Sequence, residues 1–185
     1  ILIYMKEKLY KDELIRSMKF LNKNKKVIFL GQSVKYSGNA IFNTMKDISD
    51  SKKLELPVFE ETQLGMSIGL ALEGFIPVSC FPRYDFLIVA MNQLINHLDK
   101  IRRMSGDDFR PRVIIRTSVG SRKPLDSGLQ HTQNFTPIFK KILKEIEIVH
   151  LTDPKQIFKS YKRALTRKDS RSTLLIENGD AYNTK

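Results

Sequence analysis

The sequence has no tryptophan, a single cysteine and no apolar run long enough to cross a membrane as a helix. One cysteine excludes an internal disulfide framework and a metal site built from several thiolates. That residue, Cys80, lies in an apolar run, which favours a core position over a nucleophile. Residues 1–6 lack the pattern of a secretory signal. These absences predict a cytoplasmic protein with no membrane segment and no metal site of its own.

The composition is that of a globular protein, with 185 residues, 41% hydrophobic and 28% charged. This length predicts a single domain over residues 1–185. The net charge of +12 raises the alternative of a nucleic-acid partner. The lysines are dispersed over the polar positions of predicted helices, however, and no zinc-finger spacing or arginine-rich tail accompanies them. This pattern favours a solvated basic surface over a nucleic-acid site.

Hydrophobic periodicity predicts an alternation of strands and helices along the chain. The predicted strands are 27–30, 54–59, 77–81, 112–117, 146–149 and 172–176. The predicted helices are 5–23, 40–48, 61–73, 85–103 with Asp85 as a candidate cap, 135–144 and 153–167. Such an alternation predicts an α/β fold in three layers, α/β/α, around a mostly parallel sheet of about six strands.

The stretch over residues 60–77 is the most informative part of the chain. Two carboxylates, Glu60 and Glu61, precede a predicted helix that contains Gly65 and Gly69. Glycine costs helix stability, so two glycines on one helix face indicate that another helix or a ligand packs closely there. The positive end of the helix dipole favours carboxylates in the first turn. The alternative is a charge pair that merely begins an ordinary helix.

Three polar segments follow predicted strands. They are Glu60, the turn over 82–86 and the long loop over 118–134. Ligands of parallel α/β sheets bind beyond the carboxyl ends of the strands, and a loop of this length within a compact domain is commonly functional. We therefore expect the three segments to meet at one edge of the sheet and to form a site there.

Seven segments in order extend this picture: 27–31, 57–60, the small-residue helix to Gly74 and Pro77, 81–86, 92–106, 128–133 and 174–178. Their order and spacing resemble the pyrimidine-binding domain shared by transketolases and the beta subunits of 2-oxoacid dehydrogenase E1 components. The resemblance covers most of the chain. It implies that family's α/β/α fold and its cofactors, thiamine diphosphate and Mg²⁺.

The resemblance also implies roles for single residues. Glu60 matches the glutamate that contacts and activates the cofactor's aminopyrimidine, with Glu61 as the poorer match. Phe86 matches the aromatic residue that stacks on the pyrimidine. Pro82 is a further candidate for the pocket wall. Tyr84 either lines the site or covers the start of a helix.

A histidine completes the candidate site. His131 lies in the segment Gly-Leu-Gln-His-Thr-Gln and matches the family histidine that faces the substrate, where it binds a carboxylate or moves a proton. The alternative is a histidine that only holds its loop. Arg122 and Lys123 are candidates for attracting an anionic substrate, whereas His97 and His150 are expected to be structural.

Two departures from the family pattern shape the expectation of partners. Arg83 and Val89 stand where transketolases carry further aromatics, so the pocket resembles E1 beta more closely. The sequence has no Gly-Asp-Gly…Asn motif for Mg²⁺ and the diphosphate. The resemblance therefore implies a partner chain, an alpha-like pyrophosphate-binding subunit, in a dimer of such domains or an α2β2 assembly. The C-terminal transketolase domain is expected to be absent, because the sequence ends about where it would begin.

The expected function is that of the beta-like subunit of a split thiamine-diphosphate enzyme. Such an enzyme decarboxylates a 2-oxo acid, or transfers a two-carbon or acyl unit from a 2-oxo acid or ketose. The alternative is a non-catalytic assembly or regulatory subunit that keeps the fold.

Overall fold

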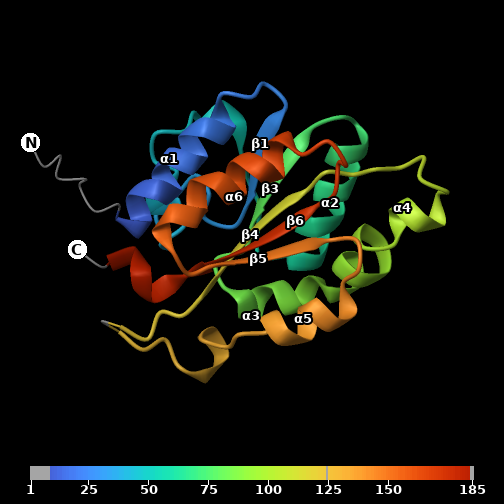
Figure 1. Ribbon diagram of the computed structural model, residues 1–185. Helices are drawn as coiled ribbons and strands as arrows, with labels where there is room; N and C mark the ends of the chain where they lie inside the picture. Colours follow the sequence, from blue (N-terminus) through green and yellow to red (C-terminus); the bar gives the residue numbers. More distant parts are fainter. Residues whose placement is uncertain (1–8, 124, 184–185) are drawn as a thin grey trace, which may run out of the picture.

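The computed structural model describes residues 9–123 and 125–183, which form a parallel sheet between two layers of helices (Figure 1). The strands are β1 (Val27–Gly31), β2 (Lys53–Glu55), β3 (Ile76–Cys80), β4 (Ile114–Val119), β5 (Glu147–Leu151) and β6 (Thr173–Asn178). The six strands lie in the order β2-β1-β3-β4-β6-β5, and every neighbouring pair is parallel. The predicted three-layer α/β/α fold is confirmed.

The main helices are α1 (Tyr10–Asn22), α2 (Glu60–Leu72), α3 (Tyr84–Leu87), α4 (Ile101–Met104), α5 (Thr136–Ile142) and α6 (Pro154–Thr166). Helices α1 and α6 cover one face of the sheet and share one hydrophobic cluster with it. Helices α2, α3 and α5 contribute to a second cluster on the other face (Figure 1). Because the four inner strands β1, β3, β4 and β6 are covered on both sides, they are mostly buried, and β1 and β3 read as largely apolar runs.

Two predicted elements differ from the observed ones. The strand expected over 54–59 ends at Glu55, because β2 is an edge strand and Pro57 has no N–H to continue a ladder. The helix expected over 85–103 is divided into α3, a 3₁₀ turn η3 (Ile88–Ala90), a π-helix η4 (Asn92–Leu98) and α4. Asp85 is not its cap, since Arg83 precedes the first helical residue.

Smaller differences concern two further helices and the glycines of α2. The helix expected over 40–48 is only a 3₁₀ turn, η1 (Phe42–Thr44), and residues 5–8 of the first predicted helix lie outside the described residues. At Gly65 an added Cβ would lie 3.5 Å from Gln93 Cδ, which is ordinary contact distance. Gly69 is exposed, and within the described chain nothing approaches its Cβ position within 4 Å.

A fully buried ion pair lies between the sheet and the α1/α6 layer. Arg116 Nε on β4 donates to Glu177 Oε1 on β6 at 2.6 Å, and its Nη2 donates to Oε2 at 3.1 Å. The hydroxyls of Tyr161 on α6 and Tyr182 on the terminal 3₁₀ turn η6 (Gly179–Asn183) donate to the same carboxylate. Burial acts to lower the pKa of Arg116, but the Glu177 carboxylate raises it above its ordinary value. The buried Glu177 carboxylate thereby links β6 to β4, α6 and η6.

Candidate functional site

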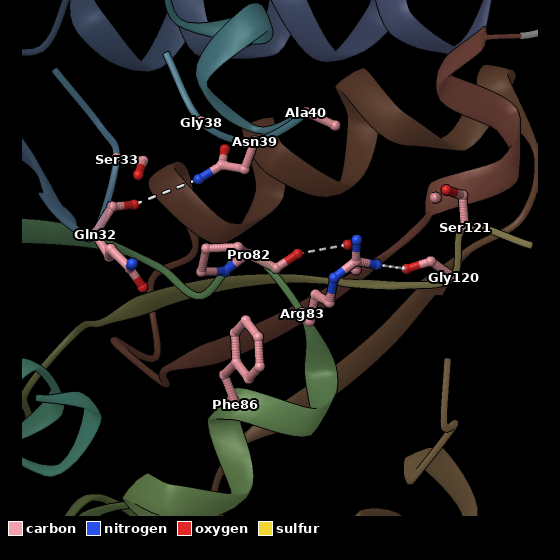
Figure 2. Close-up of a pocket in the computed structure, with 12 residues that line it drawn as sticks. Gln32, Ser33, Gly38, Asn39, Ala40, Pro82, Arg83, Phe86, Gly120 and Ser121 are labelled. Carbon is pink, nitrogen blue, oxygen red and sulfur yellow. Dashed lines mark hydrogen bonds between the residues drawn. The ribbon is translucent and has the colours of Figure 1, made fainter. Parts of the chain in front are cut away.

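The loops that follow β1, β3, β4 and β6 surround a cavity of about 210 Å³ at the carboxyl edge of the sheet (Figure 2). The lining residues are Gln32, Ser33, Gly38, Asn39, Ala40, Pro82, Arg83, Phe86, Ser118, Gly120, Ser121 and Gly179. Parallel strands direct their carboxyl ends to one edge, which is why loops distant in sequence meet here. The turn over 82–86 and the start of the 118–134 loop therefore converge, as the sequence predicts.

Phe86 and His131 lie against each other beside this cavity. Phe86, on α3, is half-buried and lines the cavity, and His131 ends the 3₁₀ turn η5 (Leu129–His131). The two rings meet edge to face, with centroids 5.6 Å apart at 89°. His131 Nδ1 lies 3.0 Å from the Ser127 carbonyl oxygen. A carbonyl only accepts, so Nδ1 carries the hydrogen and the neutral ring presents a free lone pair at Nε2.

Glu60 and Glu61 begin α2 but differ in their surroundings. Glu61 Oε1 accepts hydrogen bonds from Asn92 Nδ2 at 2.8 Å and Gln93 Nε2 at 3.1 Å, and the bond from Asn92 is the main cause that lowers the pKa of Glu61. Glu60 is half-buried, and no group among the described residues pairs with its carboxylate. It follows the loop after β2, on the same edge as the cavity, but does not line it.

The other two predicted cofactor contacts, Pro82 and Tyr84, lie in different places: one lines the cavity and the other is buried in the core. Pro82 lines the cavity, and its carbonyl oxygen accepts a hydrogen bond from Ser118 Oγ at 2.8 Å. Tyr84 is fully buried, with its ring 5.7 Å from that of Phe135 and 5.2 Å from that of Phe139. Burial raises the pKa of Tyr84. Its side chain points into the core and not into the cavity, which favours the alternative that it covers the helix start.

Arg83 is the site residue that the sequence prediction did not assign. Its Nη1 donates to the carbonyl oxygens of Gly120 and His131, the latter at 3.3 Å, and Figure 2 shows the bond to Gly120. Arg83 thereby joins the start of α3 to both ends of the loop that carries His131. The available signal was an arginine in the 82–86 turn at a position where transketolases have an aromatic ring.

The remaining candidates lie outside the cavity. Arg122 and Lys123 are exposed, and their backbone N–H groups donate to Asp180 Oδ1 at 2.6 and 2.9 Å. His97 is exposed on η4, and His150 is half-buried on β5. Neither histidine lines the cavity, and their structural reading stays a prediction.

The described chain contains neither a membrane-spanning helix nor a cluster of metal-ligating side chains. Over residues 9–123 and 125–183, no helix combines the length and apolar character needed to cross a membrane. Within the same ranges, His, Cys, Asp and Glu side chains form no group of three or more that is placed to hold a metal ion.

The chain is similar to proteins of a known family over most of its length. Residues 10–185 match the family model described as "Transketolase, pyrimidine binding domain". The pyruvate dehydrogenase E1 component subunit beta of Gracilaria tenuistipitata var. liui is 29% identical over 163 residues, covering 86% of this chain and 49% of the relative. The corresponding subunit of Cyanidium caldarium is 28% identical over 169 residues, covering 89% of this chain and 50% of the relative.

A solved structure gives the same fold. A split gene transketolase in an inactive beta4 tetramer aligns with a TM-score of 0.60 and 13% identity, over 93% of this chain and 52% of its own. At this identity the likeness concerns the fold alone. The chain spans about half the length of the curated relatives it matches. With the family model matched from residue 10 to residue 185, the chain belongs to the family of transketolase pyrimidine-binding domains.

Proposed function

We propose that this chain is the beta-like, pyrimidine-binding part of a thiamine-diphosphate enzyme that acts on a 2-oxo acid or a ketose. The observation that carries the proposal is the contact between Phe86 and His131 beside the cavity. The family pattern gives both residues a place next to the cofactor, and the fold brings them together although they are far apart in sequence. The pyruvate dehydrogenase E1 beta relatives support the same reading.

The residues present fit the pyrimidine half of the cofactor. An aminopyrimidine offers ring nitrogens to a carboxyl group and a flat face to an aromatic ring. Glu60 supplies a carboxylate with no partner in the described chain, and Phe86 supplies a half-exposed ring. When bound, thiamine diphosphate supplies the chemistry that cleaves a bond next to a carbonyl. Glu60 and Phe86 would hold its pyrimidine, while Mg²⁺ and the diphosphate would lie mainly on an alpha-like partner chain.

His131 is suited to hold or move a proton near the substrate. The Ser127 carbonyl accepts the Nδ1 hydrogen and fixes the tautomer, so Nε2 is the atom that exchanges a proton. The edge of Phe86 and the hydrogen bond from Arg83 to the His131 carbonyl limit the positions of the ring and its backbone. A positioned acid–base group of this kind contributes about 10²- to 10⁴-fold to a rate.

The decisive experiment compares Glu60→Gln with Glu61→Gln. The chain is co-purified from its host with its partner, identified by mass spectrometry, and the complex is assayed with thiamine diphosphate, Mg²⁺ and a panel of 2-oxo acids and ketoses. Loss of at least about 10²-fold in turnover for Glu60→Gln is expected. Glu61→Gln is the matched control, since that carboxylate already pairs with Asn92 and Gln93 on its own chain.

The same comparison tests the alternative of a non-catalytic assembly subunit. Equal turnover of the Glu60→Gln complex and the unmodified complex would support that alternative and remove the catalytic assignment. Cofactor binding, followed by calorimetry with and without the partner, separates a chain that holds the pyrimidine from one that only assembles. A pairing of two such domains, or an α2β2 assembly, and a cytoplasmic location belong to the proposal as expectations.

A further inference from the structure

Arg83 carries a positive charge that no carboxylate in the described chain neutralises. The more buried arginines behave differently, since Arg116 pairs with Glu177 and Arg167 pairs with Glu147. Arg83 Nη1 uses its two hydrogens on the carbonyls of Gly120 and His131. A guanidinium has five N–H groups, so the three on Nε and Nη2 remain, and no acceptor for them lies among the described residues. The side chain is thus held in place with three of its five donors unused.

The cavity around Arg83 contains no acidic side chain. Its polar lining consists of neutral amides and hydroxyls, from Gln32, Ser33, Asn39, Ser118 and Ser121. Carboxylates on two of the surrounding segments are engaged by backbone N–H groups. Glu55 accepts bonds from the N–H groups of residues 33–35, at 2.6 to 2.8 Å, and Asp180 accepts those of residues 122 and 123. The cavity therefore combines one cation with neutral hydrogen-bonding groups.

We infer that this cavity binds the anionic group of the substrate, with Arg83 as the residue that pairs with its charge. A carboxylate or a phosphate matches the planar N–H pair of a guanidinium, and the hydroxyls of Ser33 and Ser121 are available to donate to its remaining oxygens. Phe86 lines the same cavity and contacts His131, so an anion at Arg83 lies beside the proposed acid–base group. The inference rests on the proposed function for the identity of the ligand as a substrate, and it makes Arg83 the determinant of an anionic substrate class.

Anion binding to the chain itself tests the inference without cofactor or partner. Inorganic phosphate and pyruvate are titrated separately and followed by amide NMR shifts at Gly120 and Ser121. Arg83→Gln removes the charge and is expected to weaken binding by about tenfold to a hundredfold. Arg103→Gln removes the same charge from an exposed position on α4, outside the cavity, and is expected to change binding by less than about threefold, because solvent and salt screen it.

Arg83→Gln also removes the bonds that hold the loop, so a second pair of variants keeps Arg83 intact. Ser121→Asp adds a negative charge to the cavity wall, and Ser121→Asn adds a neutral group of the same size. The difference between the two isolates the effect of charge, and we expect the aspartate variant to bind the anion at least about tenfold more weakly.

The outcomes separate the two proposals. Tighter binding of phosphate indicates a phosphorylated ketose, and tighter binding of pyruvate indicates a 2-oxo acid; either supports the inference. Binding of neither anion, equal binding by Arg83→Gln and the unmodified chain, or equal binding by the two Ser121 variants would overturn it. Turnover of the complex and anion binding by the chain are separate measurements, so loss of the catalytic assignment would show in turnover alone.

Discussion

Replacing Glu177 by glutamine is expected to destabilise the fold by about 3–5 kcal/mol, because the substitution leaves the Arg116 charge buried without a counter-charge. Both side chains are fully buried, so solvent does not screen the loss. The carboxylate accepts four hydrogen bonds, two from Arg116 and one each from Tyr161 and Tyr182. Glutamine keeps one oxygen acceptor but turns an amide group toward donors, so at least two of these bonds are lost.

Two further variants provide reference values for this loss of stability. Tyr182→Phe removes a single donor to the carboxylate, and a loss of about 1–2 kcal/mol is expected. The double variant Arg116→Met with Glu177→Met buries no charge, and replacing both members of a buried ion pair is often close to neutral. The double variant should therefore be more stable than Glu177→Gln, although the Tyr161 and Tyr182 hydroxyls then lose their acceptor.

The measurement is urea unfolding followed by far-ultraviolet circular dichroism, since the chain has no tryptophan to report by fluorescence. A domain of this kind has a total stability of about 5–15 kcal/mol, so the single substitution removes a large share of it. A loss below about 1 kcal/mol for Glu177→Gln would contradict the argument. A double variant less stable than the single one would also contradict it, because the buried unpaired charge would then not be the cause.

Three other predictions concern the thiol, a histidine and a glycine. Burial raises the pKa of the buried Cys80 thiol to about 12, so a thiol reagent near neutral pH should react only as the chain unfolds, and fast labelling of the folded protein would contradict this. Burial, and then the Lys140 charge, lower the pKa of His150 below its ordinary 6.5. Protonation of His150 thus favours the unfolded chain, so the free energy of unfolding should decrease as the pH falls below about 6.5. Urea titrations at several pH values should show a smaller decrease for His150→Asn. Gly31→Ala should destabilise the fold by more than about 2 kcal/mol in the same assay, because Gly31 has φ +146° and an added Cβ would overlap the Cys80 carbonyl oxygen; a neutral result would show that the backbone relaxes there.

The sequence was most informative where its pattern is local. Apolar runs such as 27–30 predict buried parallel strands, and a helix start after Asp153 and Pro154 agrees with α6, where Asp153 accepts the Lys155 N–H at 2.8 Å. The 85–103 segment was less predictable. Its apolar spacing suits one long helix, but the backbone changes from α to 3₁₀ to π turns along it, and such changes depend on packing that periodicity does not record.

The candidate site was likewise predictable from the sequence only in part. The resemblance to the family nominated Glu60, Phe86 and His131, because these residues stand at the positions of its pattern. Tyr84 and Arg83 show the limit. Adjacent residues at a helix start point in different directions, so Tyr84 enters the core while Arg83 lines the cavity.

By itself the sequence determined the parallel α/β class, the family and the chemical types of the candidate site residues, because strand and helix periodicity and residue identity are local properties of the chain. Only the tertiary structure decided which side chains contact one another or line the same cavity. The Phe86–His131 contact, the unneutralised Arg83 and the Arg116–Glu177 pair each join segments that strand order brings together. Burial and pairing of charge depend on distances across the sheet, and these exist only once the chain has folded.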